Sequence, residues 1–338
     1  MRPRLNILQE YLAREFVDEY QEGRMSRRDM MRRLLGITGG VAATATLLLS
    51  LGCAPAATAT PTAQAAAPEP TPRAQPSPTA SGQVAAPPTT QAIPTATPAA
   101  GAKLSVLASD PSVQAGDVTF SGGGTTLMAY LAQPTGSGPF PGVLVCHENR
   151  GLTDHIRDVT RRLAKAGFVG LALDLLSRQG GTAKVDPAQM PGLLSGNPAQ
   201  AVTDFQAAFS HIQTLPSVAK GKVGMVGFCF GGGVTWLVAT AIPELKAAVP
   251  YYGPNPPLED VPKIQAPVLA QYGELDQRID AGIPAIESAM KANGKTFEKV
   301  VYPGAGHAFN NDTGGAYNEQ AAVDAWAKTL DWFRRYLA

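Results

Sequence analysis

The chain has 338 residues, of which 35 are Gly and 29 are Pro, and its formal net charge is +1. A charge so close to zero argues against nucleic acid as a partner, because it provides no basic surface for a polyanion. Pro crowds one stretch of the chain, and the residues after about position 104 suffice for one α/β domain of ordinary size.

Residues 1–52 are predicted to be an export signal. They contain Ser26-Arg27-Arg28, and a twin Arg followed by apolar residues resembles a twin-arginine signal. The next stretch, 36–52, is apolar but rich in Gly, Ala and Thr, and it is shorter than the ~20 residues that span a bilayer. The alternative is an N-terminal anchor that is not cleaved.

Cys53 is predicted to carry lipid. The run Leu49-Ser50-Leu51-Gly52-Cys53 resembles a lipobox, although Ser50 stands where Leu is usual. The alternative is a Cys that merely lies beyond a cleavage site. With lipid, the protein is expected at the cell envelope, tethered to the outer face of the membrane.

Residues 53–103 are predicted to be a disordered tether. They consist almost wholly of Pro, Ala, Thr, Ser and Gln, and such a segment has too few large apolar side chains to offset the entropy lost on ordering. Its prolines favour extended polyproline II structure. The tether would therefore separate the membrane from a folded domain over residues 104–338.

Strands and helices alternate along residues 104–338. A hairpin is expected over 118–132, and buried strands over 142–146, 168–173, 222–226, 245–251, 267–272 and 297–302. Helices are expected over 154–166, from 198 to about 212, and over 234–240, 279–293 and 317–337, with Asp154 as a cap and with loops at 174–197 and 253–262. This alternation predicts an α/β fold: a mostly parallel sheet with helices on both faces and its chemistry at the carboxyl ends of the strands.

The segment 227–232, Gly-Phe-Cys-Phe-Gly-Gly, lies between an expected strand and an expected helix. It has the pattern of a nucleophile elbow with Cys229 in place of Ser. The glycines permit a sharp turn in which backbone approaches backbone. The N–H of Phe230, at the start of the helix, can then stabilise an oxyanion. The alternative is a Gly-rich turn with a buried structural Cys.

Two further residues follow later strands in the order expected of a catalytic triad. Asp276 comes after 267–272, and His307 comes after 297–302. A thiol needs a base beside it, and His307 can take its proton while Asp276 orients the imidazole. His147 is expected to be structural. No pair of His or Cys has metal-ligand spacing and no dinucleotide fingerprint is present, so no cofactor is expected.

The segment from about 118 to 337 resembles the dienelactone hydrolase family of the α/β-hydrolase fold. The resemblance rests on the Cys229 elbow, Glu148, Asp276 and the run 306–309, Gly-His-Ala-Phe. It implies metal-free hydrolysis of enol lactones and related esters, as by carboxymethylenebutenolidase. We expect the chain to be a monomer that acts on a small molecule. The resemblance also implies that Glu148 is the resting partner of the thiol and that the N–H of Asn149 is the second oxyanion donor. Members that act on dienelactone carry a substrate-binding Arg shortly after the catalytic His, where this chain has Asn310-Asn311-Asp312.

Two other functions remain open at this level. The domain could be a non-catalytic envelope binding protein, because an exported thiol risks oxidation. Alternatively, Cys146 and Cys229 could form a redox-active disulfide, although Cys146 sits inside a strand and is expected to be a buried apolar group.

Overall fold

The computed structural model describes residues 5–50 and 105–338. The predicted tether and Cys53 lie outside the described residues, as do residues 1–4 and 51–52 of the predicted export signal. The domain boundaries drawn from the sequence therefore stay predictions.

An eight-stranded sheet has the order β1-β2-β4-β3-β5-β6-β7-β8. Neighbouring strands from β4 to β8 are parallel, whereas β2 runs antiparallel to both β1 and β4. The mostly parallel sheet and the first hairpin are thus confirmed. The strands span Val113–Gly122 (β1), Thr125–Pro134 (β2), Phe140–Cys146 (β3), Val169–Asp174 (β4), Val218–Phe228 (β5), Ala247–Tyr251 (β6), Val268–Gly273 (β7) and Phe297–Tyr302 (β8).

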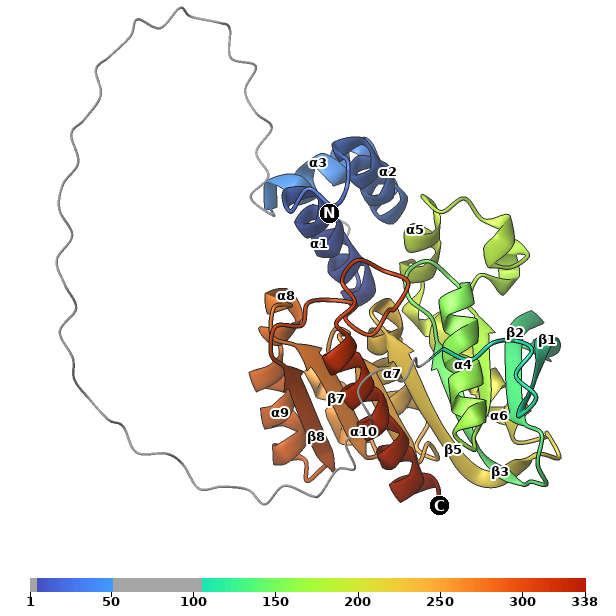
Figure 1. Cartoon of the computed structure of the whole chain (residues 1–338). Helices are drawn as coiled ribbons and strands as arrows, with labels where there is room; N and C mark the ends of the chain where they lie inside the picture. The colour runs from blue at the N-terminus through green and yellow to red at the C-terminus, as the bar shows by residue number, and fades with distance from the viewer. Residues whose placement is uncertain (1–4, 51–104) are drawn as a thin grey trace, which may run out of the picture.

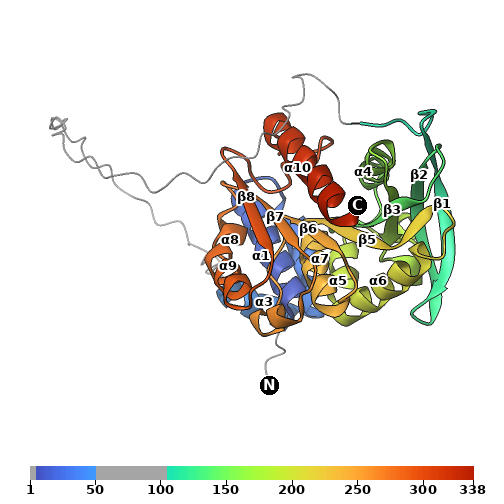
Figure 2. The ribbon, with the colours of Figure 1, turned by 90° about the horizontal axis from the view of Figure 1, so that it is seen from below.

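Helices cover both faces of this sheet (Figures 1 and 2). Helices α4 and α10 lie on one face, and α6, α7 and α9 lie on the other. The amphipathic helices α4 and α10 turn their apolar sides toward the sheet, whereas α7 is apolar and buried along most of its length. The helices of the domain span Asp154–Lys165 (α4), Met190–Ser195 (α5), Pro198–Ile212 (α6), Phe230–Ala241 (α7), Gln277–Asp280 (α8), Ile283–Ala292 (α9) and Glu319–Leu337 (α10).

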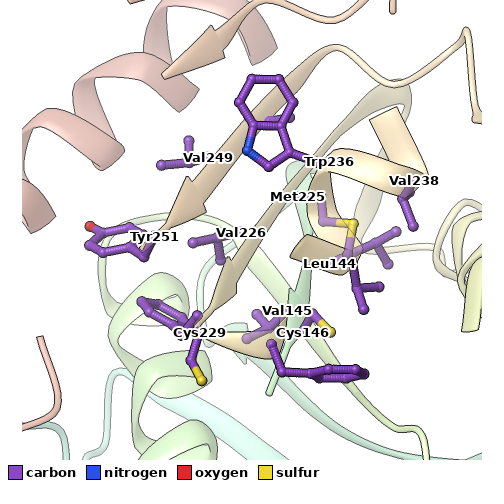
Figure 3. Close-up of a cluster of buried hydrophobic side chains, with 14 of the residues drawn as sticks. Leu144, Val145, Cys146, Met225, Val226, Cys229, Trp236, Val238, Val249 and Tyr251 are labelled. Carbon is purple, nitrogen blue, oxygen red and sulfur yellow. The ribbon is translucent and has the colours of Figure 1, made fainter. Parts of the chain in front are cut away.

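The central strands are buried on both sides, which explains their continuous apolar sequences. Every residue of β4, β6 and β7 is buried. Figure 3 shows Met225, Val249 and Trp236 in one such cluster, with Cys229 at its edge and the Cys229 sulfur directed away from it. The core therefore holds the end of β5 firmly and places Cys229 at its margin, where the residue is only 3% exposed.

Three local predictions are wrong. The segment 174–197 is not one loop, because it contains the 3-10 helices Ser177–Gln179 (η1) and Thr182–Lys184 (η2) as well as α5. The predicted loop 253–262 likewise contains a 3-10 helix, Leu258–Lys263 (η3). Asp154 does not cap α4: it is the first helical residue, and Thr153 holds the cap position. Short polar segments with Gly and Pro carry too weak a pattern to separate single turns from loops.

The segment predicted to be an export signal forms three helices in the described residues. They span Ile7–Gln21 (α1), Arg27–Thr38 (α2) and Val41–Ser50 (α3). Asn6 begins α1 with a capping box, and Ser26 caps α2. Figure 1 shows α1, in dark blue, running down toward the edge of the sheet where the parallel strands end. Within residues 5–50 and 105–338, no helix combines the length and apolar character that crossing a bilayer requires.

Candidate active site

The turn from β5 to α7 has the geometry that the elbow pattern predicts. Cys229 sits between them with φ 59° and ψ −121°, a conformation that is costly for a residue with a side chain. An ideal Cβ on Gly227 would lie 2.1 Å from the Gly231 carbonyl oxygen, and one on Gly231 would lie 2.5 Å from that of His147. Glycine is therefore required at both positions, because any larger residue would force the backbone apart.

Asp276 and His307 meet at the neighbouring strand ends. His307 Nδ1 lies 2.5 Å from Asp276 Oδ2, and both side chains are nearly buried. Burial alone would lower the pKa of His307, but the adjacent Asp276 carboxylate raises it well above its ordinary value. Burial conversely raises the pKa of Asp276, but His307 outweighs this effect and holds it below its usual range. The pair therefore favours a negative carboxylate beside a strongly basic imidazole.

A side chain from α1 contacts both the thiol and the imidazole, which also interact with each other directly. Tyr11 Oη is 3.2 Å from Cys229 Sγ and 3.2 Å from His307 Nε2. Glu15, one turn further along α1, has its carboxylate oxygens 3.7 and 3.9 Å from the same sulfur. Burial, followed by the charge of Glu15, raises the pKa of the Cys229 thiol, while His307 opposes the shift. With α1 in this place the sulfur is favoured as a neutral thiol.

Glu148 lies close to the site, but its carboxylate faces a different partner. Asn311 donates a 2.9 Å hydrogen bond to Glu148 Oε2. Burial raises the pKa of Glu148, with the charge of His307 opposing the shift. Among the described residues, the carboxylate in contact with Cys229 Sγ is that of Glu15, so the resting contact implied for Glu148 is not the one that this structure contains.

Asn149, the second predicted oxyanion donor, follows Glu148 in the loop after β3. Its side-chain amide donates a 2.9 Å hydrogen bond to Glu15 Oε1. Phe230, the first donor, is the first residue of α7, and N–H groups in the first turn of a helix have no partner within the helix. The loop after β3 and the start of α7 thus present these two backbone N–H groups at the same edge of the sheet as Cys229.

His147 has a structural role, as its position suggested. The Leu175 N–H donates to His147 Nε2 at 3.2 Å, so the ring proton is on Nδ1, which donates to the Glu148 carbonyl oxygen at 2.6 Å. Burial lowers the pKa of His147. A neutral ring with both nitrogens in use holds the loop that carries Glu148 and Asn149.

The loop after His307 is anchored to α4. Arg162 and His155 both contact the Asp312 carboxylate. These contacts join α4 to the segment that follows His307. In this segment the family resemblance leads us to expect a substrate-binding Arg in members that act on dienelactone. Asp312 is therefore used here for structure.

Cys146 and Cys229 are both free thiols in this structure, so the disulfide alternative does not apply to it. The sequence spacing did not predict one group of possible metal ligands. Cys229 Sγ, a ring nitrogen of His307 and a carboxylate oxygen of Glu15 all lie within 4.8 Å of one another. These groups could ligate a metal ion. However, Arg278 places a guanidinium nitrogen 3.9 Å from Glu15, and a fixed positive charge there disfavours a second cation.

A cleft of about 840 Å³ opens beside this group of residues. It reaches His307 and Asp276, and Arg278 faces it. Cys229 is not among the lining residues and is only 3% exposed. The part of the lining that comes from α1 and the turn after it is mainly acidic and consists of Glu15, Asp18, Glu19 and Glu22, together with Arg24.

Sequence reasoning missed the contributions of Tyr11, Glu15 and Arg278. The first two lie in a segment interpreted as polar and as an export signal. A signal was available, because Leu8, Leu12 and Phe16 in the same segment recur at helical spacing and are fully buried. Such periodicity predicts a packed helix, but it does not predict what the helix packs against.

Comparison with known proteins agrees with this architecture. Residues 127–337 match the model of the dienelactone hydrolase family. A protein of Methylorubrum extorquens named "Putative carboxymethylenebutenolidase" is 39% identical over 236 residues, covering 66% of this chain and 81% of that protein. A protein of the same name from Escherichia coli K12 is 38% identical over 247 residues, covering 67% of this chain and 89% of that protein.

Solved structures agree as well. The crystal structure titled "Putative Dienelactone Hydrolase" from Klebsiella pneumoniae has a TM-score of 0.62 at 35% identity, covering 66% of this chain and 99% of that one. The dienelactone hydrolase-like promiscuous phosphotriesterase P91, from metagenomic libraries, has a TM-score of 0.61 at 28% identity and covers 67% and 99% of the two chains. The family match spans more than half of the chain, and the predicted α/β-hydrolase fold is confirmed. The chain is thus a hydrolase-fold protein that belongs to the dienelactone hydrolase family.

Proposed function

We propose that the chain is a cofactor-free hydrolase of carboxylic ester or lactone bonds, with Cys229 as nucleophile, His307 as base and Asp276 as the group that orients the base. The observation that carries this proposal is the convergence of the three side chains at one edge of the sheet, after β5, β7 and β8. The Asp276–His307 contact is 2.5 Å, and Cys229 occupies a strained turn at the start of α7. Strain of this kind is typical of nucleophiles held in place for reaction.

The first half of the reaction forms a thioester. His307 Nε2 takes the proton of the Cys229 thiol, and the sulfur attacks the carbonyl carbon. The carbonyl π electrons move to oxygen, and the N–H groups of Phe230 and Asn149 stabilise that oxyanion. As the C–O bond of the ester breaks, the imidazolium returns its proton to the leaving alcohol oxygen. Asp276 stabilises the imidazolium throughout and keeps the proton on Nδ1.

The second half restores the enzyme. A water molecule gives a proton to His307 Nε2, and its oxygen attacks the thioester carbonyl. The same two N–H groups hold the new oxyanion. When the C–S bond breaks, the sulfur regains its proton from His307 and the carboxylic acid leaves.

The names of the relatives support this type of hydrolysis. Those named carboxymethylenebutenolidase point to a lactone, and the phosphotriesterase P91 indicates that the fold tolerates other electrophiles. Asn310-Asn311-Asp312, with Asp312 engaged by Arg162, replaces the Arg region expected for dienelactone itself. We therefore propose small esters or lactones other than dienelactone as the substrate class.

The test compares two cysteine variants of the full chain on a panel of p-nitrophenyl esters and lactones of increasing size. Cys229→Ala should abolish turnover, whereas Cys146→Ala, the same change at a buried cysteine in β3, should retain it. Brief incubation with a slow ester should add an acyl mass to Cys229. If Cys229→Ala kept the turnover of the unaltered chain, Cys229 would not be the nucleophile. If the unaltered chain turned over no member of the panel, the domain would instead be a binding module on a hydrolase fold.

We propose in addition that the protein is exported to the cell envelope and cleaved before a lipidated Cys53. Arg27-Arg28 and the apolar run ending at Cys53 support this proposal. Mass spectrometry of membrane-extracted protein should find a lipid-modified N-terminus at Cys53. An intact N-terminus would rule out cleavage, and an unmodified thiol at Cys53 would rule out the lipid.

A further inference from the structure

We infer that helix α1 is an intramolecular inhibitor: it occupies the substrate position in front of Cys229, and turnover requires it to be displaced or removed. The inference rests on the proposed function for its effect on turnover. Its effect on access to the thiol can be measured independently.

The contacts of α1 fall on the groups that a substrate must use. Tyr11 Oη lies 3.2 Å from both Cys229 Sγ and His307 Nε2, so the phenol is packed against both groups that take part in the proton transfer. Burial, followed by the charge of Cys229, raises the pKa of Tyr11 well above its ordinary value, so the phenol is neutral and cannot serve as a base. A carbonyl carbon cannot reach the sulfur while the phenol is there.

Glu15 fills a second part of the same space. Its carboxylate stands in front of the sulfur, accepts a hydrogen bond from the Asn149 side chain and faces Arg278. Arg278 also lies 4.6 Å from the centre of the Tyr11 ring and pairs with Asp18 at 3.2 Å. One half-buried cation thus holds three side chains of α1 over the site.

The attachment of α1 to the domain is separate from these polar contacts. Leu8 is fully buried, and an ideal Cβ on Gly233 of α7 would lie 3.1 Å from its Cδ2. Asn6 donates a 2.8 Å hydrogen bond to the Ser195 carbonyl oxygen of α5. Helix α2 packs on α5 so closely that a Cβ on Gly192 would lie 2.4 Å from the Gly36 carbonyl oxygen. These contacts offer positions at which docking can be weakened without touching a reacting group.

The predicted export signal contains α1, so cleavage before Cys53 would also remove the inhibitor. The thiol would then stay covered and neutral until the signal is lost. A protein that binds substrate only when α1 is undocked behaves as one with an internal competitor. Its apparent KM equals the intrinsic KM divided by the undocked fraction, while kcat is unchanged.

The experiment weakens docking in the full chain from both sides. Leu8→Asp buries a charge in the α1 interface, and Gly192→Val pushes α2 away from α5. Tyr20→Asp, at an exposed position of α1 (37% exposed), is the matched control. Iodoacetamide labelling of Cys229 and ester kinetics are measured on each variant, with circular dichroism to verify the fold. Both docking variants should label about tenfold faster and show an apparent KM about tenfold lower at equal kcat, and the control should match the unaltered chain.

A measurement on the unaltered chain tests the inference even if both docking variants misfold. Labelling of Cys229 and hydrogen exchange of the α1 amides should report the same opening free energy, below that of the β5 amides. If labelling instead followed the global unfolding seen at β5, the inference would be wrong.

The other possible outcomes distinguish the covering role of α1 from the proposed function. Faster labelling with loss of kcat would make α1 a working part of the active site and overturn the inference. Labelling unchanged in folded docking variants that turn over esters would overturn it while leaving the proposed function intact. Faster labelling without ester turnover in any variant would support the covering role of α1 and contradict the proposed function.

Discussion

Gly227→Ala should damage both stability and activity, because the elbow has no room for a single methyl group. The new Cβ would lie 2.1 Å from the Gly231 carbonyl oxygen and 2.4 Å from Thr235 Oγ1. The carbonyl belongs to α7 backbone, so relief requires the helix to move away from β5. Overpacking commonly costs about 1–3 kcal/mol, and a contact this short with fixed backbone falls at the upper end, about 3 kcal/mol. In a domain of this size the melting temperature should fall by about 6–12 °C.

Unfolding in urea, followed by tryptophan fluorescence, measures the effect directly; the three tryptophans lie on α7 (Trp236) and α10 (Trp326 and Trp332). Gly116→Ala is the matched control, because no heavy atom lies within 4 Å of an ideal Cβ at that position of β1. The control should stay within about 1 kcal/mol of the unaltered protein. Turnover of Gly227→Ala should fall about 100-fold even where it is folded, since a small displacement of Cys229 misplaces the sulfur. A Gly227→Ala protein as stable and active as the control would refute this account of the elbow.

Three other predictions concern charge in and around the site. Asp276→Asn should lower the pKa of His307 and reduce turnover about 10³-fold, measured as a pH–rate profile; an unchanged profile would remove Asp276 from its orienting role. Glu148→Gln should shift the pH dependence of Cys229 alkylation to lower pH, because the negative charge of Glu148 is among the causes that raise the pKa of the thiol; a shift to higher pH would contradict this. Burial lowers the pKa of His147 from its ordinary value of 6.5. As the pH falls below 6.5, the unfolded chain therefore takes up a proton on this ring while the folded chain does not, and the folded state loses stability. Relative to His147→Gln, the unaltered chain should lose about 1 kcal/mol of unfolding free energy between pH 7.5 and 5.5, and a constant difference between the two would show that the ring is protonated in the fold.

Much of the fold could be predicted from the sequence because its signals are local. A buried parallel strand is a short apolar run, and the turn after β5 needs glycines on both sides of Cys229, so both are visible in neighbouring residues. The positions of Asp276 and His307 followed from the same logic, since both come directly after strands whose carboxyl ends share one edge. Where that signal is weak, as in 174–197, the prediction of a plain loop was wrong.

Only the tertiary structure shows that Tyr11 and Glu15 of α1 lie against the Cys229 thiol. Tyr11 and Cys229 are 218 residues apart in the chain, and no periodicity links them. The pattern of Leu8 and Leu12 determines that α1 has a buried face, but packing on α5 and α7 determines where that face goes. The sequence likewise shows which carboxylates are present but not which groups they contact. Glu148 accepts a hydrogen bond from Asn311, and Glu15 lies beside the Cys229 sulfur. Composition and spacing set the local conformation of each segment, whereas contacts between distant segments depend on how their surfaces fit once the sheet has formed.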